Sequence, residues 1–281
     1  MTLFLAVGAA AMYGLSDFLG GVLARRASVW AIAVTSQVAA AVLTAAAVAF
    51  IPGDPTAIDL AWGAIAGVGG GVGTGFLYRG LANGRMAVVA PLSAVGAAVL
   101  PVAVGFLTGE RPATLTWVGI IAAFPAIWLV STIPDTGLSG ARSRSLDAGV
   151  VDGLLAGIGF GLLFSALGQV PDGAGLGPLA AAQSTSVLAI AVLATSMREP
   201  WVPRERSVLP ALIVGALVAA AALLFLLATQ SGLLTVASVV TSLYPAFTVL
   251  LAATLLKERV HRAQAVGMVL ALTAVALIAA G

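Results

Sequence analysis

The sequence predicts an all-α integral membrane protein whose ten transmembrane helices form two inverted five-helix repeats. Hydrophobic residues make up 60% of the chain and charged residues 9%, whereas about a quarter of the residues in a soluble domain are charged. The apolar residues fall into ten runs of about 20 residues, the length of a helix that crosses a bilayer. The two halves of the chain also resemble each other, which indicates duplication.

The ten apolar runs are too long for barrel strands and do not alternate in hydrophobicity, so helices are the favoured spanning structure. The expected spans are 2–23, 29–51, 58–78, 87–107, 115–133, 148–168, 177–197, 208–229, 235–256 and 263–280. Residues 134–147 are rich in Ser, Gly, Pro and charge, a composition that predicts a linker. The linker divides the chain into a first repeat, 1–133, and a second repeat, 148–281.

An acid–base pair marks the duplication most clearly. A shift of 148 residues superposes Glu110-Arg111, which closes the fourth run, on Glu258-Arg259, which closes the ninth. The same shift superposes four further pairs: Gly67 on Gly215, Gly84 on Gly232, Ser93 on Thr241 and Gly119 on Gly267. Chance identities are frequent in a chain so rich in Ala, Val, Leu and Gly, but the equal spacing favours duplication. Because each half has an odd number of spans, the second half enters the membrane from the opposite side.

The basic residues lie almost entirely on one side of the predicted membrane. They occur at or after the ends of the odd-numbered spans, as Arg25, Arg26, Arg79, Arg85, Arg142, Arg144, Arg198, Arg204, Arg206, Lys257, Arg259 and Arg262. The opposite loops contain only Arg111. Since Lys and Arg concentrate in cytoplasmic loops, we expect a multi-pass protein of the cytoplasmic membrane with both termini outside the cytoplasm.

Several classes of function are disfavoured by what the sequence contains. The chain has no cysteine and one histidine, His261, so neither thiolate nor imidazole ligands predict a metal site. There is no serine elbow and no nucleotide-binding motif, and we therefore expect neither an enzyme nor a cofactor. The basic residues are single or paired rather than clustered, so a nucleic-acid partner is not expected.

Three motifs resemble the drug/metabolite transporter superfamily and, within it, the EamA-type ten-helix transporters. They are the stretch from Tyr13 to Gly21, and the triplets Gly109-Glu110-Arg111 and Lys257-Glu258-Arg259. The resemblance implies two inverted repeats, a central substrate cavity and alternating access for small metabolites or drugs, often outward. It also implies termini in the cytoplasm, the opposite of what the loop charges predict, and we keep the prediction from the charges.

Asp17 is the first candidate for coupling. It lies about two helical turns before Arg25 and Arg26, within the apolar region. A carboxylate there costs about 2.5–3.5 kcal/mol and needs a partner or water. Arg79, at similar depth in the third span, would make a permanent ion pair with Asp17 that fixes two helices. Alternatively, proton and substrate compete for Asp17, an interpretation that resemblance to small multidrug transporters with an acid in their first helix supports.

Two amides and three tyrosines are candidates for the substrate cavity. Gln37 and Gln183 occupy roughly equivalent points of the two halves, where they could face each other and bind a polar substrate, or bond a neighbouring helix. Tyr13, Tyr78 and Tyr244 could line the cavity or lie at the headgroup belt. Tyr244 is the strongest aromatic candidate because it is expected in the middle of the ninth span.

Prolines and glycines predict hinges and close helix contacts. Pro91, Gly96 and Pro101 in the fourth span, and Pro245 in the ninth, predict paired interruptions near the binding site. Seven glycines between positions 63 and 75 have overlapping Gly-xxx-Gly spacings, which let helix backbones approach closely.

The two acid–base pairs lie at opposite membrane faces. We expect Glu110, Arg111, Glu258 and Arg259 to cap helices or form ion pairs near the headgroups, and a gate that opens and closes between transport states is the alternative.

We predict a secondary transporter, an exporter of small amphipathic metabolites such as amino acids or drugs, that works by alternating access and is either coupled to protons or facilitative. The expected partners are the substrate, the lipid bilayer and protons, while both a monomer and a homodimer remain open. A flippase for lipid-linked headgroups with the same fold is the main alternative, and an intramembrane enzyme is the least favoured.

Overall fold

The chain is almost entirely helical in a computed structural model that describes residues 1–24, 27–82, 86–131, 142–257 and 260–281. The helices are α1 (Thr2–Ala24), α2 (Val29–Val48), α3 (Ala57–Ala82), α4 (Met86–Leu107), α5 (Thr114–Ser131), α6 (Arg142–Leu167), α7 (Gly177–Ser196), α8 (Ala211–Gln230), α9 (Leu234–Thr241), α10 (Tyr244–Leu255) and α11 (Arg262–Ala280). Within the described residues, nine segments are long and apolar enough to cross a membrane. The fourth predicted span corresponds to α4, whose apolar part Leu92–Leu107 is shorter than these nine, and the ninth predicted span corresponds to α9 and α10 together.

Each predicted span overlaps with helix, and in every span but the ninth the differences lie at the ends. The largest is at α6, which begins at Arg142, inside the segment 134–147 that was predicted to be a linker. Its first residues are polar, so hydropathy alone could not show that the helix extends beyond the apolar run. In the ninth span, Ser242 and Leu243 interrupt the helix that was predicted to be continuous.

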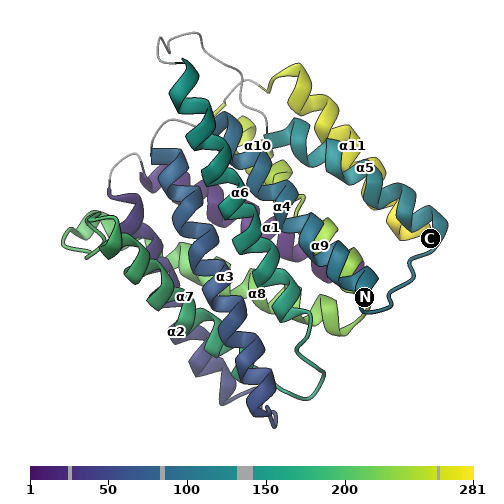
Figure 1. Cartoon of the computed structure of the whole chain (residues 1–281), viewed down its shortest axis with the longest axis horizontal. Coiled ribbons are helices and arrows are strands. Elements are labelled where there is room, and N and C mark those ends of the chain that lie inside the picture. Colours follow the sequence, from purple (N-terminus) through teal and green to yellow (C-terminus); the bar gives the residue numbers. More distant parts are fainter. Residues whose placement is uncertain (25–26, 83–85, 132–141, 258–259) are drawn as a thin grey trace.

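Packing between the two halves is reciprocal (Figure 1). The helix α3 packs on α6 and α7, and its counterpart α8 packs on α1 and α2. Likewise α4 packs on α6, while its counterpart, α9 with α10, packs on α1. The helices α2 and α7, and α5 and α11, pack on each other, the latter pair side by side at one edge of the bundle. Exchange of the halves preserves these contacts, so the molecule consists of two inverted five-helix repeats.

The glycines of α3 allow this helix to lie between α6 and α7. Gly63, Gly67 and Gly71, spaced by four residues, face α7, where a Cβ on Gly67 would lie 2.0 Å from a backbone carbonyl oxygen. Gly69 and Gly73 face α6, with a Cβ on Gly69 only 2.7 Å from a carbonyl oxygen there. Both distances are too short for any side chain, and the predicted role in close packing is confirmed.

Glycines that are equivalent in sequence have equivalent places in the fold. Gly67 of α3 lies against α7, and Gly215 of α8 lies against α2, where a Cβ would be 2.2 Å from the carbonyl oxygen of Ser36. Gly119 of α5 lies against α11, and Gly267 of α11 lies against α5. The shift of 148 residues therefore superposes positions that make the same contact in opposite repeats.

The outer surface of the bundle is apolar. Large hydrophobic side chains that belong in the spans are more than half exposed, among them Val42, Ile121, Ile158, Leu188, Val192 and Leu272. Such a surface would be unstable in water and matches the hydrocarbon of a bilayer.

Candidate functional site

A cavity lies between the two repeats, within eight of the ten spans. Its empty volume is about 950 Å³, including the space at its opening, and its described lining residues come from α1 to α4, α6 to α8 and α10. None of these lining residues belongs to α5 or α11, which pack on each other outside the cavity.

Aromatic side chains line much of the cavity. The chain has three tyrosines, Tyr13, Tyr78 and Tyr244, and all of them line it. The Tyr13 ring packs between those of Phe164, at 6.0 Å, and Tyr244, at 6.4 Å between centroids, in tilted and edge-on arrangements. All three tyrosines therefore lie at the cavity, although Tyr78 is also close to the end of its span.

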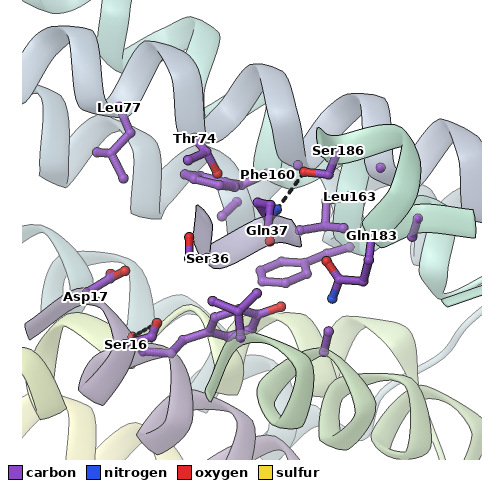
Figure 2. A pocket seen from close by; sticks show the side chains of 18 of the residues that line it. Ser16, Asp17, Ser36, Gln37, Thr74, Leu77, Phe160, Leu163, Gln183 and Ser186 are labelled. Atoms are coloured by element: carbon purple, nitrogen blue, oxygen red, sulfur yellow. Dashed lines mark hydrogen bonds between the residues drawn. The ribbon is translucent and has the colours of Figure 1, made fainter. Parts of the chain in front are cut away.

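Asp17 is the one charged residue among the described lining residues of the cavity. It extends from α1 on the opposite side of the cavity from Gln183 (Figure 2). Ser16, next to it, donates a hydrogen bond to the Tyr13 carbonyl oxygen at 2.8 Å. Within the described residues, Asp17 forms neither a hydrogen bond nor an ion pair, so its carboxylate is available to the cavity.

The predicted Asp17–Arg79 ion pair is wrong. Arg79 of α3 instead forms an ion pair with Asp152 of α6, whose side chain is fully buried, and its Nε donates to Asp152 Oδ1 at 2.8 Å. The guanidinium also lies 4.5 Å from the centroid of the Phe76 ring, a cation–π distance. Arg79 therefore links the two repeats and does not neutralise Asp17.

Asp152 is a residue that the sequence interpretation missed. It lies five positions into the predicted sixth span, and a carboxylate inside an apolar run needs a partner. That isolated acid was the available signal. What the sequence does not show is that α3 packs on α6, which brings Arg79 to Asp152 rather than to Asp17.

Gln37 and Gln183 both line the cavity, and both are buried. Their amides do not bond each other. Gln37 Nε2 donates to Ser186 Oγ at 2.6 Å, across the contact between α2 and α7. Ser186 lies one turn after Gln183 on α7, and all three side chains line the cavity (Figure 2). We refer to Gln37, Gln183 and Ser186 as the polar group.

The ninth span is broken beside the cavity. Tyr244 and Pro245 begin α10, so the proline is in the first turn of this helix. The backbone N–H groups of a first turn have no partner within the helix, so a proline there, which has no N–H, loses no helical hydrogen bond. Tyr244 is therefore at a helix start and not in mid-helix as predicted. The helix α4 is continuous through Pro91, Gly96 and Pro101, so these residues do not end a helix in the first repeat, and their role as hinges stays a prediction.

Gly96 makes a close helix contact in place of a break. A Cβ on Gly96 would lie 2.6 Å from the Cα of Gly157, so α4 and α6 cross here with their backbones almost touching. The shift of 148 residues places Tyr244 at the position of Gly96 in the second repeat. Tyr244 lines the cavity, whereas Gly96 is not among the described lining residues, so the two equivalent positions contribute differently to it.

Glu110 caps a helix of the other repeat. Its carboxylate accepts the backbone N–H groups of Leu234, at 2.5 Å, and Thr235, at 2.9 Å, and also the Thr235 hydroxyl. A carboxylate at a helix N-terminus satisfies unpaired N–H groups and the positive end of the helix dipole. Arg111 donates to the carbonyl oxygen of Phe106 at 3.2 Å.

The predicted role of the first acid–base pair at helix ends therefore agrees with these contacts. The second pair, Glu258 and Arg259, lies outside the described residues.

The sequence matches one family model twice, over residues 1–132 and 147–280, and that model describes the EamA-like transporter family. The chain belongs to the EamA-like transporter family. A solved structure described only as "Crystal structure of protein" superposes on it with a TM-score of 0.75, over 98% of this chain and 95% of the other, at 14% sequence identity. That likeness shows the fold alone. No curated protein matches the sequence.

Membership of this family agrees with the predicted resemblance to drug/metabolite transporters. The protein is therefore a multi-pass membrane transporter, and the family consists of transporters rather than enzymes. The two family matches correspond to the two halves that pack reciprocally in the structure.

Proposed function

We propose that this EamA-like protein is a secondary transporter that exports small amphipathic organic cations, whether metabolites or drugs, across the cytoplasmic membrane in exchange for protons. The observation that carries the proposal is the carboxylate of Asp17, which has no partner within the described residues, in an aromatic cavity. No described lining residue is Lys, Arg or His. The Asp17 carboxylate would therefore attract a cation into the cavity and repel an anion.

The aromatic side chains favour the same class of substrate. Tyr13, Tyr78, Tyr244, Phe160 and Phe164 offer ring faces and edges around the cavity. A ring face attracts a cation by about 0.5–2 kcal/mol, with the larger value where water is excluded. The rings also provide apolar surface for the rest of an amphipathic molecule, so charge and hydrophobic burial act together.

Coupling to protons follows from competition for one group. When Asp17 is protonated it no longer attracts a cation, and when a cation occupies the site a proton binds less well. If the transporter changes between its inward-open and outward-open states only when Asp17 holds a proton or a cation, each cycle exchanges one for the other. An inward proton gradient would then drive the cation out of the cell.

Alternating access has suitable elements in this fold. The cavity lies between the repeats, so rocking of one repeat against the other could expose it to either side. The break before Tyr244 places a helix end in the wall of the cavity, where the chain could bend as the repeats move. The pair α5 and α11 packs outside the cavity and would support the repeats while they move.

The main alternative is a flippase for lipid-linked headgroups. Such a protein needs a wide cavity that opens sideways to lipid. The described lining residues come from eight spans of both repeats, which favours a small solute bound between the repeats.

Reconstitution into liposomes tests the proposal. Purified protein is incorporated with a pH gradient, and accumulation of tetraphenylphosphonium and of phenethylamine is measured. We expect gradient-driven accumulation that is lost in Asp17→Asn. The matched control is Asp172→Asn, because Asp172 is exposed in the loop before α7, and it should behave as wild type. Accumulation by Asp17→Asn equal to that of wild type would show that Asp17 does not couple transport.

A further inference from the structure

The polar group formed by Gln37, Gln183 and Ser186 is not explained by cation binding. It lies apart from Asp17 in the cavity (Figure 2). All three side chains are at least nine-tenths buried, with exposures of 8%, 5% and 2%. Uncharged amides and a hydroxyl cannot replace the carboxylate, so this group would serve a different part of a bound molecule.

One acceptor in the group has no partner. Gln37 uses its Nε2 to donate to Ser186, and its Oε1 is buried without a hydrogen-bond partner among the described residues. A buried unpaired acceptor costs about 1–3 kcal/mol. The hydroxyls of Thr35, Ser131, Ser165 and Ser242 are also buried without a partner among the described residues, but of these five groups only Gln37 is among the described lining residues of the cavity. A donor supplied by a ligand would remove this cost.

Gln183 provides a second unused amide. Within the described part of the chain its side chain forms no hydrogen bond, although it lines the cavity. Ser186 accepts the bond from Gln37 and keeps its own proton for donation. The group therefore offers two amides and a hydroxyl from both repeats, on the side of the cavity away from the charge.

We propose that Gln37, Gln183 and Ser186 form a second subsite, which binds an uncharged hydrogen-bonding group of the substrate, such as a hydroxyl or amide. This inference rests on the proposed binding of cations in the same cavity. The preferred substrate then carries an ammonium group at one end, an apolar middle and a neutral donor at the other end. A molecule that lacks the donor leaves Gln37 Oε1 unpaired and binds more weakly.

Tyramine and phenethylamine distinguish the two subsites because they differ only in one hydroxyl group. Their affinities are measured by displacement of tetraphenylphosphonium from the purified protein. We expect wild type to bind tyramine about tenfold more tightly, the equivalent of one good hydrogen bond. In Gln183→Met and Gln37→Met the ratio should fall toward one while phenethylamine binding is retained. Retained phenethylamine binding also shows that these variants fold.

Gln230→Met is the control, because Gln230 bonds Pro171 outside the cavity and should keep the wild-type ratio. Equal binding of the two amines by wild type, or an unchanged ratio in both cavity variants, would overturn the subsite. If Asp17→Asn still binds both amines as wild type does, or if wild type binds neither, the proposed cation site itself is wrong and the subsite falls with it.

Discussion

The substitution Gly67→Ala tests the contact on which the inverted-repeat packing depends. In an ordinary helix, Gly→Ala stabilises by about 1 kcal/mol. At Gly67 the new Cβ would lie 1.9 Å from Thr185 Oγ1 and 2.0 Å from the carbonyl oxygen of Ala182. Since the second atom is backbone, α3 and α7 would have to separate along their crossing. Overpacking of this kind costs about 1–3 kcal/mol or more, so we expect a net loss of stability despite the helical gain.

The measurement is the midpoint of thermal unfolding of the purified protein in detergent, followed by intrinsic fluorescence. In a chain of this size a loss of 1 kcal/mol lowers the midpoint by about 2–4 °C, so a fall of several degrees is expected. Gly21→Ala is the control, because a Cβ at Gly21 of α1 meets no atom within 4 Å. Gly215→Ala should reproduce the effect in the other repeat. A midpoint for Gly67→Ala at or above wild type would refute the close-packing explanation.

Three further predictions concern the polar contacts and the topology. Asp152→Ala should lower the unfolding midpoint, because it leaves Arg79 without this buried partner, and the double variant Arg79→Leu/Asp152→Leu should recover most of the loss. If the double variant is no more stable than Asp152→Ala, the charge pair is not the cause. Glu110→Ala should cost about 1–2 kcal/mol in the same assay, through the lost cap of α9, and an unchanged midpoint would contradict that role. In this cysteine-free chain, a membrane-impermeant thiol reagent applied to whole cells should label Thr108→Cys but not Arg204→Cys, as the loop charges predict. The reverse labelling would place the termini in the cytoplasm.

The spans and their duplication could be predicted because they depend on local properties. Length and hydropathy define a membrane helix, and a hydrophobic run such as 263–280 has few alternatives. The glycines could be paired between repeats because equal spacing survives in the sequence. The start of α6 was less predictable, since polar residues that follow Arg142 can extend a helix beyond the membrane without any hydropathy signal.

The partners of charged residues depended on tertiary packing and were not predictable in the same way. Arg79 and Asp17 are at similar depth, which made an ion pair plausible from the sequence. The packing of α3 on α6 instead gives Arg79 a buried partner in Asp152. The interruption before Tyr244 was also missed, because Pro245 predicts a kink within a helix as readily as the start of a new one. The cavity residues were the more predictable part, since a carboxylate, amides and tyrosines in apolar spans are costly unless they share a polar space.

The most direct test of the central claim is the pH dependence of cation binding. Isothermal titration of tetraphenylphosphonium into the purified protein is carried out over a range of pH for wild type, Asp17→Asn and Asp172→Asn. We predict that wild type and Asp172→Asn lose affinity as pH falls, approaching tenfold per pH unit once Asp17 is protonated. Asp17→Asn should bind weakly at every pH. Binding by Asp17→Asn with wild-type affinity and the same pH dependence would contradict the claim that protons and substrate compete for this carboxylate.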